Sequence, residues 1–274
     1  MLLACLQAIE RRFFKGWKMQ GWIMEVLRVW LDGQSTATTK GTTITAYPDL
    51  EPNEIGVFDD TVLEFLDDFT LASKDHGIKL MISTHSFNAL EGGDVYGALY
   101  GTGFFYEWEN ATSQFDNRLR HVLNHEHKTL HQPWRELSDY IFAFEAQNEA
   151  MIGKDQEYIE AHQGWQCERA NTIKGELGSN SDSGYHGWGV FPRRIQGVVS
   201  RAQAAGKKLL FQEWGACFFS TENNNCPTAS QITAAGMPWM YWQVIPNADP
   251  RFGSDYEIGA LAAPAAFDYS GFLL

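Results

Sequence analysis

Short apolar runs alternate with helical stretches along most of the chain, and this alternation restricts the fold more than any other feature of the sequence. The apolar runs predict buried strands at 26–30, 78–83, 140–146, 208–212 and 238–244. The apolar spacing between them predicts helices at 60–72, 115–129, 157–174 and 195–205. The glycine- and aromatic-rich stretch 92–108 is expected to be a long loop. Because strands that alternate with helices assemble into parallel sheets, the sequence predicts an α/β fold.

Polar or aromatic side chains lie at or near the ends of these predicted strands. In an α/β barrel the carboxyl ends of the strands converge on one face, where the active site forms. A chain of 274 residues suits one such barrel, which takes about 250 residues. We therefore predict a single (β/α)8 TIM-barrel domain over residues 1–274. The residues expected at its active face are Arg28, His85, Asn148, Glu149, Glu213 and Trp242.

Three segments are too short for a complete barrel. No convincing first strand precedes Gly21, and residues 227–236 leave room for only a short seventh helix. The interval from Glu149 to Glu213 is 64 residues. Strands five to seven with their helices need about 90 residues there. We therefore expect an incomplete barrel, from a truncated or mis-spliced chain, that leaves strand edges unpaired.

The charge balance excludes two classes of partner. The chain carries 34 acidic and 21 basic residues, with a formal net charge of −13 at pH 7. Nucleic acid and anionic membrane surfaces both require a basic face. In addition, no stretch approaches the roughly 18 consecutive apolar residues that a transmembrane helix needs. We therefore predict that the protein binds neither nucleic acid nor a membrane.

A group of histidines between 121 and 131 raises the question of a metal site. In a helical zinc pair, two histidines lie four residues apart and a glutamate directly follows the first. Here Val122 follows His121, and His125 and His127 lie only two apart. A solvated helix face is the favoured interpretation. Since the chain also lacks a glycine-rich phosphate loop and a Gly-x-Ser-x-Gly motif, we predict no metal and no cofactor.

Glu149 and Glu213 suit the cleavage of a glycosidic bond, which uses two carboxyl groups on rigid elements that face each other. Asn148 is expected to bind the 2-hydroxyl of a sugar, and Arg28 to favour the ionised form of Glu213, because a nearby cation stabilises a carboxylate. Trp242 is expected to form a floor on which a sugar ring stacks. The alternatives are solvated loop glutamates, an arginine that reaches solvent and, for the histidine at the strand end, a core residue with its hydrogen bonds satisfied.

These segments resemble the signature strands of glycoside hydrolase family 5, which belongs to a large clan of retaining barrel enzymes. The resemblance is strongest to fungal members similar to endo-β-1,4-mannanases, and it extends from about residue 27 to residue 245. The segments that carry it are Phe144–Glu149 (FEAQNE), Gln212–Gly215 (QEWG), Trp239–Trp242 (WMYW), Leu27–Trp30 and Ser83–His85.

The resemblance implies a role for each matching residue. It implies that Glu149 is the acid/base and Glu213 the nucleophile of a double displacement. It also implies that Asn148 binds substrate with support from Arg28 and His85. Tyr185 and His186 are the candidates for the family's histidine and tyrosine at the sixth strand. With these two, the predicted substrate-binding residues are Arg28, Trp30, His85, Asn148, Tyr185, His186, Trp214 and Trp242.

We therefore predict hydrolysis of internal β-1,4 bonds in mannan by a monomeric enzyme whose partner is a β-linked polysaccharide. A β-1,4-glucanase is the near alternative, because cellulases and mannanases share these residues. A non-catalytic carbohydrate-binding protein and a non-functional fragment are the alternatives from other classes.

The cysteines and the chain start bear on where the protein works. Cys217 and Cys226 bracket a polar loop that a disulfide can staple, and Asn110–Thr112 forms a glycosylation tripeptide. The apolar stretch 1–9 has no basic residues before it and no clear cleavage site, so we do not interpret it as a signal peptide. By family resemblance we nevertheless expect a secreted protein.

Overall fold

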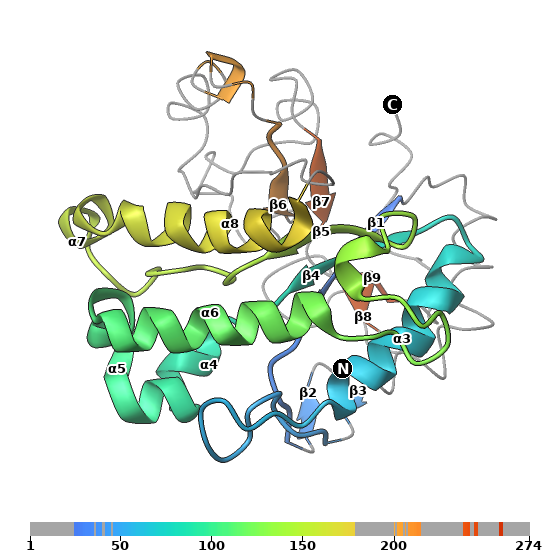
Figure 1. Ribbon diagram of the computed structural model, residues 1–274, viewed down its shortest axis with the longest axis horizontal. Coiled ribbons are helices and arrows are strands. Elements are labelled where there is room, and N and C mark those ends of the chain that lie inside the picture. Colours follow the sequence, from blue (N-terminus) through green and yellow to red (C-terminus); the bar gives the residue numbers. More distant parts are fainter. Residues whose placement is uncertain are drawn as a thin grey trace, which may run out of the picture. The chain divides into compact units, whose positions relative to one another are not determined.

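The computed structural model describes residues 25–35, 37–39, 42–44, 46–178, 200, 202–204, 206, 208–214, 238–241, 244–245 and 258–259 (Figure 1). The chain divides into two compact units. Residues 24–35 and 46–182 form the sheet unit, and the remaining segments (1–23, 36–45 and 183–274) form the second unit.

A three-stranded parallel sheet lies at the centre of the sheet unit. Its strands are β1 (Val26–Trp30), β4 (Lys79–Ser83) and β5 (Ile141–Glu145), in the order β1-β4-β5. Trp30 pairs with Ser83, and Ser83 pairs with Glu145, so the three strands end side by side. The central strand is buried from Leu80 to Ser83, as expected for a strand covered on both faces. The strands predicted at 26–30, 78–83 and 140–146 and their parallel arrangement are confirmed.

Helices follow each strand of this sheet or lead into it. α3 (Thr61–Lys74) precedes β4 and confirms the helix predicted at 60–72. α6 (Glu109–Asn124) and α8 (Gln163–Leu177) run side by side (Figure 1). The helix predicted at 157–174 is divided into α7 (Gln156–Ala161) and α8, because His162 lies between them in a non-helical conformation. A 3-10 helix, η2 (Trp134–Glu136), leads into β5.

The prediction of a long loop at 92–108 is wrong. α4 (Phe87–Glu91) is followed by α5 (Val95–Glu107), whose first turn is capped by Asp94, which accepts a hydrogen bond from the Gly97 N–H at 2.7 Å. Two of the glycines have structural reasons. A Cβ at Gly97 would collide with the Leu90 carbonyl oxygen, and Gly101 has φ +62° at a kink in α5.

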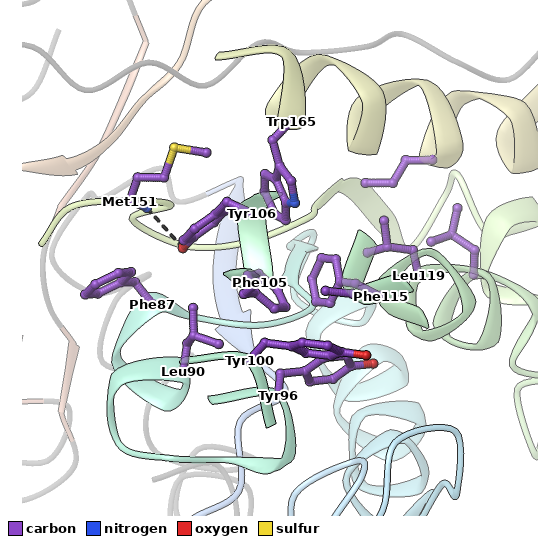
Figure 2. Close-up of a cluster of buried hydrophobic side chains, with 13 residues drawn as sticks. Phe87, Leu90, Tyr96, Tyr100, Phe105, Tyr106, Phe115, Leu119, Met151 and Trp165 are labelled. Carbon is purple, nitrogen blue, oxygen red and sulfur yellow. Dashed lines mark hydrogen bonds between the residues drawn. The ribbon is translucent and has the colours of Figure 1, made fainter. Parts of the chain in front are cut away.

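An aromatic core joins α4, α5, α6 and α8 (Figure 2). Phe105 lies at its centre, with edge-on contacts to Tyr96 and Phe115 at centroid distances of 5.6 and 5.2 Å. Trp165 of α8 stacks on Phe115 at 5.7 Å. Edge-on and offset contacts of this kind are the favoured geometry of aromatic pairs. The core therefore fixes the α4–α5 segment, which directly follows the end of β4.

The second unit contains three short strand pairs in its described residues. β2 (Ala37–Thr39) and β3 (Thr42–Ile44) form an antiparallel hairpin. β6 (Phe211–Trp214) pairs in parallel with β7 (Trp239–Tyr241), and β8 (Val244–Ile245) with β9 (Ile258–Gly259). The strands expected at 208–212 and 238–244 are therefore present with shifted bounds. Mixed α/β structure with parallel sheets is confirmed, although no sheet closes into a barrel within the described residues. No helix in these residues is long and apolar enough to cross a membrane.

Candidate active site

Arg28, Glu145 and Asn148 form a buried cluster at the carboxyl end of the three-stranded sheet. The Arg28 Nε donates to Glu145 Oε2 at 3.0 Å, and Nη2 donates to the same oxygen and, at 2.6 Å, to Asn148 Oδ1. The guanidinium also lies over the Trp30 ring, 4.7 Å from its centroid. Arg28 therefore fixes the Asn148 amide with its oxygen on the guanidinium and its NH₂ group directed away from it.

Glu145 is a residue of this cluster that the sequence did not single out. Its side chain is 4% exposed, and it is the last residue of β5. A buried carboxylate needs a cation beside it, but the burial of Glu145 is apparent only in the structure and not in the sequence. Arg28 was expected to favour the ionised form of Glu213. The contacts described above show that it pairs with Glu145 and Asn148, which belong to the same unit as Arg28 itself.

His85 follows β4 and is completely buried. Its Nδ1 lies 2.9 Å from Gln147 Nε2, and its Nε2 lies 2.6 Å from Asp94 Oδ2. Because an amide NH₂ group can only donate, Nδ1 is the acceptor and the proton resides on Nε2, which donates to Asp94. Burial opposes ionisation of Asp94, but hydrogen bonds from His85 and the Gly97 N–H outweigh it and hold the pKa of Asp94 below its ordinary value.

Glu149 occupies a turn with an uncommon backbone conformation. Glu149 and Met151 have φ values of +53° and +66°, in the left-handed region that L-residues rarely adopt. On the strand side, the Asn148 N–H donates to the His85 carbonyl at 2.8 Å, and the Phe87 N–H donates to the Asn148 carbonyl at 3.0 Å. Unfavourable backbone conformations persist only where surrounding contacts impose them, and they cluster at functional sites.

A second buried network holds the residues directly after β4. Arg118 of α6 donates from Nε to the Thr84 carbonyl at 3.0 Å and from Nη1 to Glu51 at 2.9 Å and Asp49 at 3.2 Å. Nearby, burial raises the pKa of Asp32, whose Oδ1 has no hydrogen-bond partner among the described residues. Neither Arg118 nor Asp32 was predicted from the sequence, because their burial depends on the packing of segments that are distant along the chain.

Glu213 is the third residue of β6, inside the strand rather than after it, and is half-buried. Glu149 and Glu213 belong to different units. Trp214 ends β6. The other predicted residues of this unit, namely Tyr185, His186, Trp242, Cys217 and Cys226, lie outside the described residues.

The interpretation of the histidine group as a solvated helix face is wrong for His125 and His127. α6 ends at Asn124, so these residues belong to a loop that turns inward. His127 is fully buried, and His125 Nε2 hydrogen-bonds Asp67 Oδ2 at 3.1 Å. Burial opposes ionisation of Asp67, but hydrogen bonds from His125, the Lys128 N–H and the Trp134 indole outweigh it and lower its pKa.

Solved structures resemble this chain over nearly its whole length. The endo-1,4-β-mannanase from Rhizomucor miehei matches with a TM-score of 0.64 and 16% identity, over 93% of this chain and 87% of that one. The endo-1,4-β-D-mannanase from Thermotoga petrophila RKU-1 matches with a TM-score of 0.61 and 19% identity, over 93% and 92%. A family 5 mannosidase from R. miehei gives 0.57 and 12%, over 93% and 84%.

The chain has the fold of family 5 glycoside hydrolases. The resemblance expected from the signature segments is therefore confirmed at the level of the fold, which is what identities of 12 to 19% establish. No protein-family model matches the sequence, and no curated protein matches it significantly.

Proposed function

We propose that this protein is a retaining glycoside hydrolase that cleaves internal β-1,4 bonds of mannan. The observation that carries the proposal is the turn after β5. This turn presents the half-buried Glu149 in a left-handed conformation, directly after an Asn148 whose amide is held by Arg28. The fold supports it, since two of the matching structures are endo-1,4-β-mannanases. We further propose that the strands of both units belong to one incomplete TIM barrel.

The proposed reaction is a double displacement. Glu213 attacks the anomeric carbon while Glu149 donates its proton to the departing glycosidic oxygen, so that the sugar becomes covalently bound to Glu213. Glu149, now a carboxylate, removes a proton from water, which attacks the same carbon and releases the sugar with retained configuration. No cofactor is required, because the two carboxyl groups supply both the proton and the nucleophile.

The Asn148 amide is proposed to contact the sugar in this reaction. Its oxygen is held by Arg28, so its NH₂ group is left to donate to a hydroxyl such as the 2-hydroxyl of the sugar. Arg28 and His85 then hold Asn148 in place without contacting the sugar themselves, since both are buried. For Trp30, Tyr185, His186, Trp214 and Trp242, a role in substrate binding remains part of the proposal.

The test is release of reducing sugar from mannan by the purified protein, by Glu149→Ala and by Glu213→Ala, with circular dichroism as the check of folding. We expect each variant to lose at least about 1,000-fold in kcat, since each removes a reacting group. Glu126→Ala is the matched control, because that carboxylate is 71% exposed. A folded wild type that releases no sugar from mannan or from carboxymethylcellulose would overturn the proposal.

Substrate choice is decided by the same assay. Activity on galactomannan without activity on carboxymethylcellulose supports the mannanase assignment, and activity on carboxymethylcellulose without activity on galactomannan identifies a β-1,4-glucanase; both enzymes can cleave glucomannan, which carries both kinds of residue. If no product forms but calorimetry detects binding of manno-oligosaccharides, the protein is a carbohydrate-binding relative.

A further inference from the structure

We propose that Tyr106 is a positioning residue for Glu149, an inference that rests on the function proposed above. Tyr106 lies near the end of α5, and its hydroxyl contacts both sides of the Glu149 turn. It donates to Gln147 Oε1 at 2.8 Å and accepts from the Met151 N–H at 3.1 Å. These partners lie two residues before and two residues after Glu149. Figure 2 shows the Met151 contact, with the Tyr106 ring between the turn and the aromatic core.

The environment of Tyr106 fixes the direction of its hydrogen bonds. The residue is 4% exposed, and its ring has edge-on contacts with Phe105 at 5.0 Å and Trp165 at 5.1 Å. Burial raises the pKa of the hydroxyl, which therefore keeps its proton. The Met151 N–H needs an acceptor, so the hydroxyl proton is directed to Gln147.

The same direction continues beyond Gln147. Its amide oxygen faces Tyr106, so its NH₂ group faces His85 Nδ1, and His85 in turn donates from Nε2 to Asp94. If the Gln147 amide were reversed, the Tyr106 oxygen would receive two donors while its own proton lost its acceptor. Only one orientation therefore satisfies this series of hydrogen bonds, which runs from the Met151 N–H to a carboxylate.

Asp94, which receives the last hydrogen bond, is also the N-cap of α5 and accepts from the Gly97 N–H in its first turn. Tyr106, which supplies the first side chain, lies in the same element after the kink at Gly101. A cooperative, fully satisfied network of this kind is rigid. Its rigidity acts on the backbone at Glu149 and Met151, whose positive φ values require surrounding contacts to maintain them.

Loss of the Tyr106 hydroxyl removes the acceptor from the buried Met151 N–H and the donor from Gln147. We expect the turn to relax and the Glu149 carboxyl to leave the position from which it protonates the leaving group. The rate of bond cleavage should then depend more strongly on whether the leaving group must be protonated. A sugar leaving group needs a proton from the enzyme, whereas a dinitrophenolate leaves readily without one.

The experiment compares wild type and Tyr106→Phe on mannohexaose and on 2,4-dinitrophenyl β-mannobioside, with folding checked by circular dichroism. We expect kcat/KM for mannohexaose to fall by about 10- to 100-fold, since misplacement of a catalytic group by about 1 Å has effects of this size. For the dinitrophenyl substrate we expect kcat/KM to fall by no more than about 3-fold, because departure of the dinitrophenolate needs little general-acid assistance. Tyr158→Phe is the matched control, because its hydroxyl donates to Glu107 and the Gly103 carbonyl and not to the Glu149 turn. Its kcat/KM values on both substrates should stay near those of the wild type.

Equal losses on the two substrates, or no loss on either, would overturn the role of Tyr106 while leaving the proposed hydrolase intact. A wild type that is inactive on both substrates would overturn the proposed function and, with it, this inference. Should Tyr106→Phe fail to fold, Gln147→Met removes the other end of the same hydrogen bond at similar volume. It should show the same selective loss on mannohexaose, and an unselective loss would count against the inference.

Discussion

At the scale of single residues, mutation of the Arg28–Glu145 ion pair should destabilise the protein strongly, because both side chains are almost completely buried. Arg28→Met leaves Glu145 as an uncompensated buried charge and should lower the free energy of unfolding by about 3–5 kcal/mol. The double variant Arg28→Met/Glu145→Gln should recover part of that loss, because the remaining side chain is uncharged. Urea denaturation of the single and double variants measures both effects.

Lys128→Met provides the control for this cycle. Lys128 pairs with Asp68 at 2.8 Å, but the two side chains are 39% and 56% exposed. Exposed pairs of this kind contribute about 0–1 kcal/mol, so the control should be nearly neutral. If Arg28→Met destabilised the protein no more than Lys128→Met, the buried pair would not be a structural anchor.

The sequence identified more of the proposed site than of the groups that hold it. His85, Asn148 and Glu149 were found because they follow apolar runs, and Arg28 because it interrupts one. Tyr106 and Glu145 were missed, since a tyrosine in a glycine-rich stretch and a glutamate inside a strand carry no local signal of their contacts. Their partners are 41 and 117 residues away in sequence, and only the packing of the helices on the sheet brings them together.

At the scale of elements, the kink in α5 provides a test of backbone strain. Gly101 has φ +62° and ψ −173°, a combination that is essentially confined to glycine. Gly101→Ala should therefore lower the free energy of unfolding by about 1–3 kcal/mol. Thermal or urea unfolding, followed by circular dichroism, measures the change.

Gly103 in the same helix is the matched control. A Cβ at this position would meet nothing closer than Glu107 Oε1 at 3.7 Å. Gly103→Ala should therefore be neutral or stabilise by up to about 1 kcal/mol, because alanine favours the helix and restricts the unfolded chain. If the two variants behaved alike, the kink would not require glycine.

The α4–α5 segment also shows why elements are missed. Its glycines suggested a loop, but Tyr96 and Tyr100 are buried at helical spacing before the kink at Gly101, Phe105 and Tyr106 are buried after it, and Asp94 caps the first turn. Tertiary packing thus overrides the low helix propensity of glycine. The strands were easier to predict, because a short apolar run bounded by polar residues is typical of a buried strand in an α/β protein.

At the scale of the whole molecule, the buried Asp67 and the largely buried Asp94 determine part of the acid stability. The pKa values of Asp67 and Asp94 are lower in the folded protein than their ordinary value of 3.8. A lowered folded pKa stabilises the protein above about pH 4, and this contribution is lost as the pH falls through the lowered value. Unfolding free energies measured between about pH 2 and pH 6 should therefore decrease toward the acid end.

Asp67→Asn should lower stability at pH 7 and flatten this acid dependence, because the variant has no proton to gain at that site. The neighbouring Asp68→Asn is the control, since its carboxylate is 56% exposed. A wild-type and an Asp67→Asn curve of equal slope below pH 4 would contradict the assignment.

The overall architecture was predictable only in part. The parallel order β1-β4-β5 follows from the strand–helix alternation, because parallel strands require long crossovers. The described strands of the second unit are short pairs of two to four residues. Strand ends there were displaced from their predicted positions, as for Glu213, because short apolar runs fix a strand's existence better than its register.

The hydrogen bonds that link the segments after β4 and β5 have a further consequence for ligand binding. Asn148 and His85, and Phe87 and Asn148, are joined by main-chain hydrogen bonds beyond the ends of both strands. These segments therefore lose their conformational entropy when the protein folds and not when a ligand arrives. If a sugar chain binds there, as proposed, it meets segments that are already ordered, so more of the interaction free energy is available for affinity and for orientation of the reacting bond.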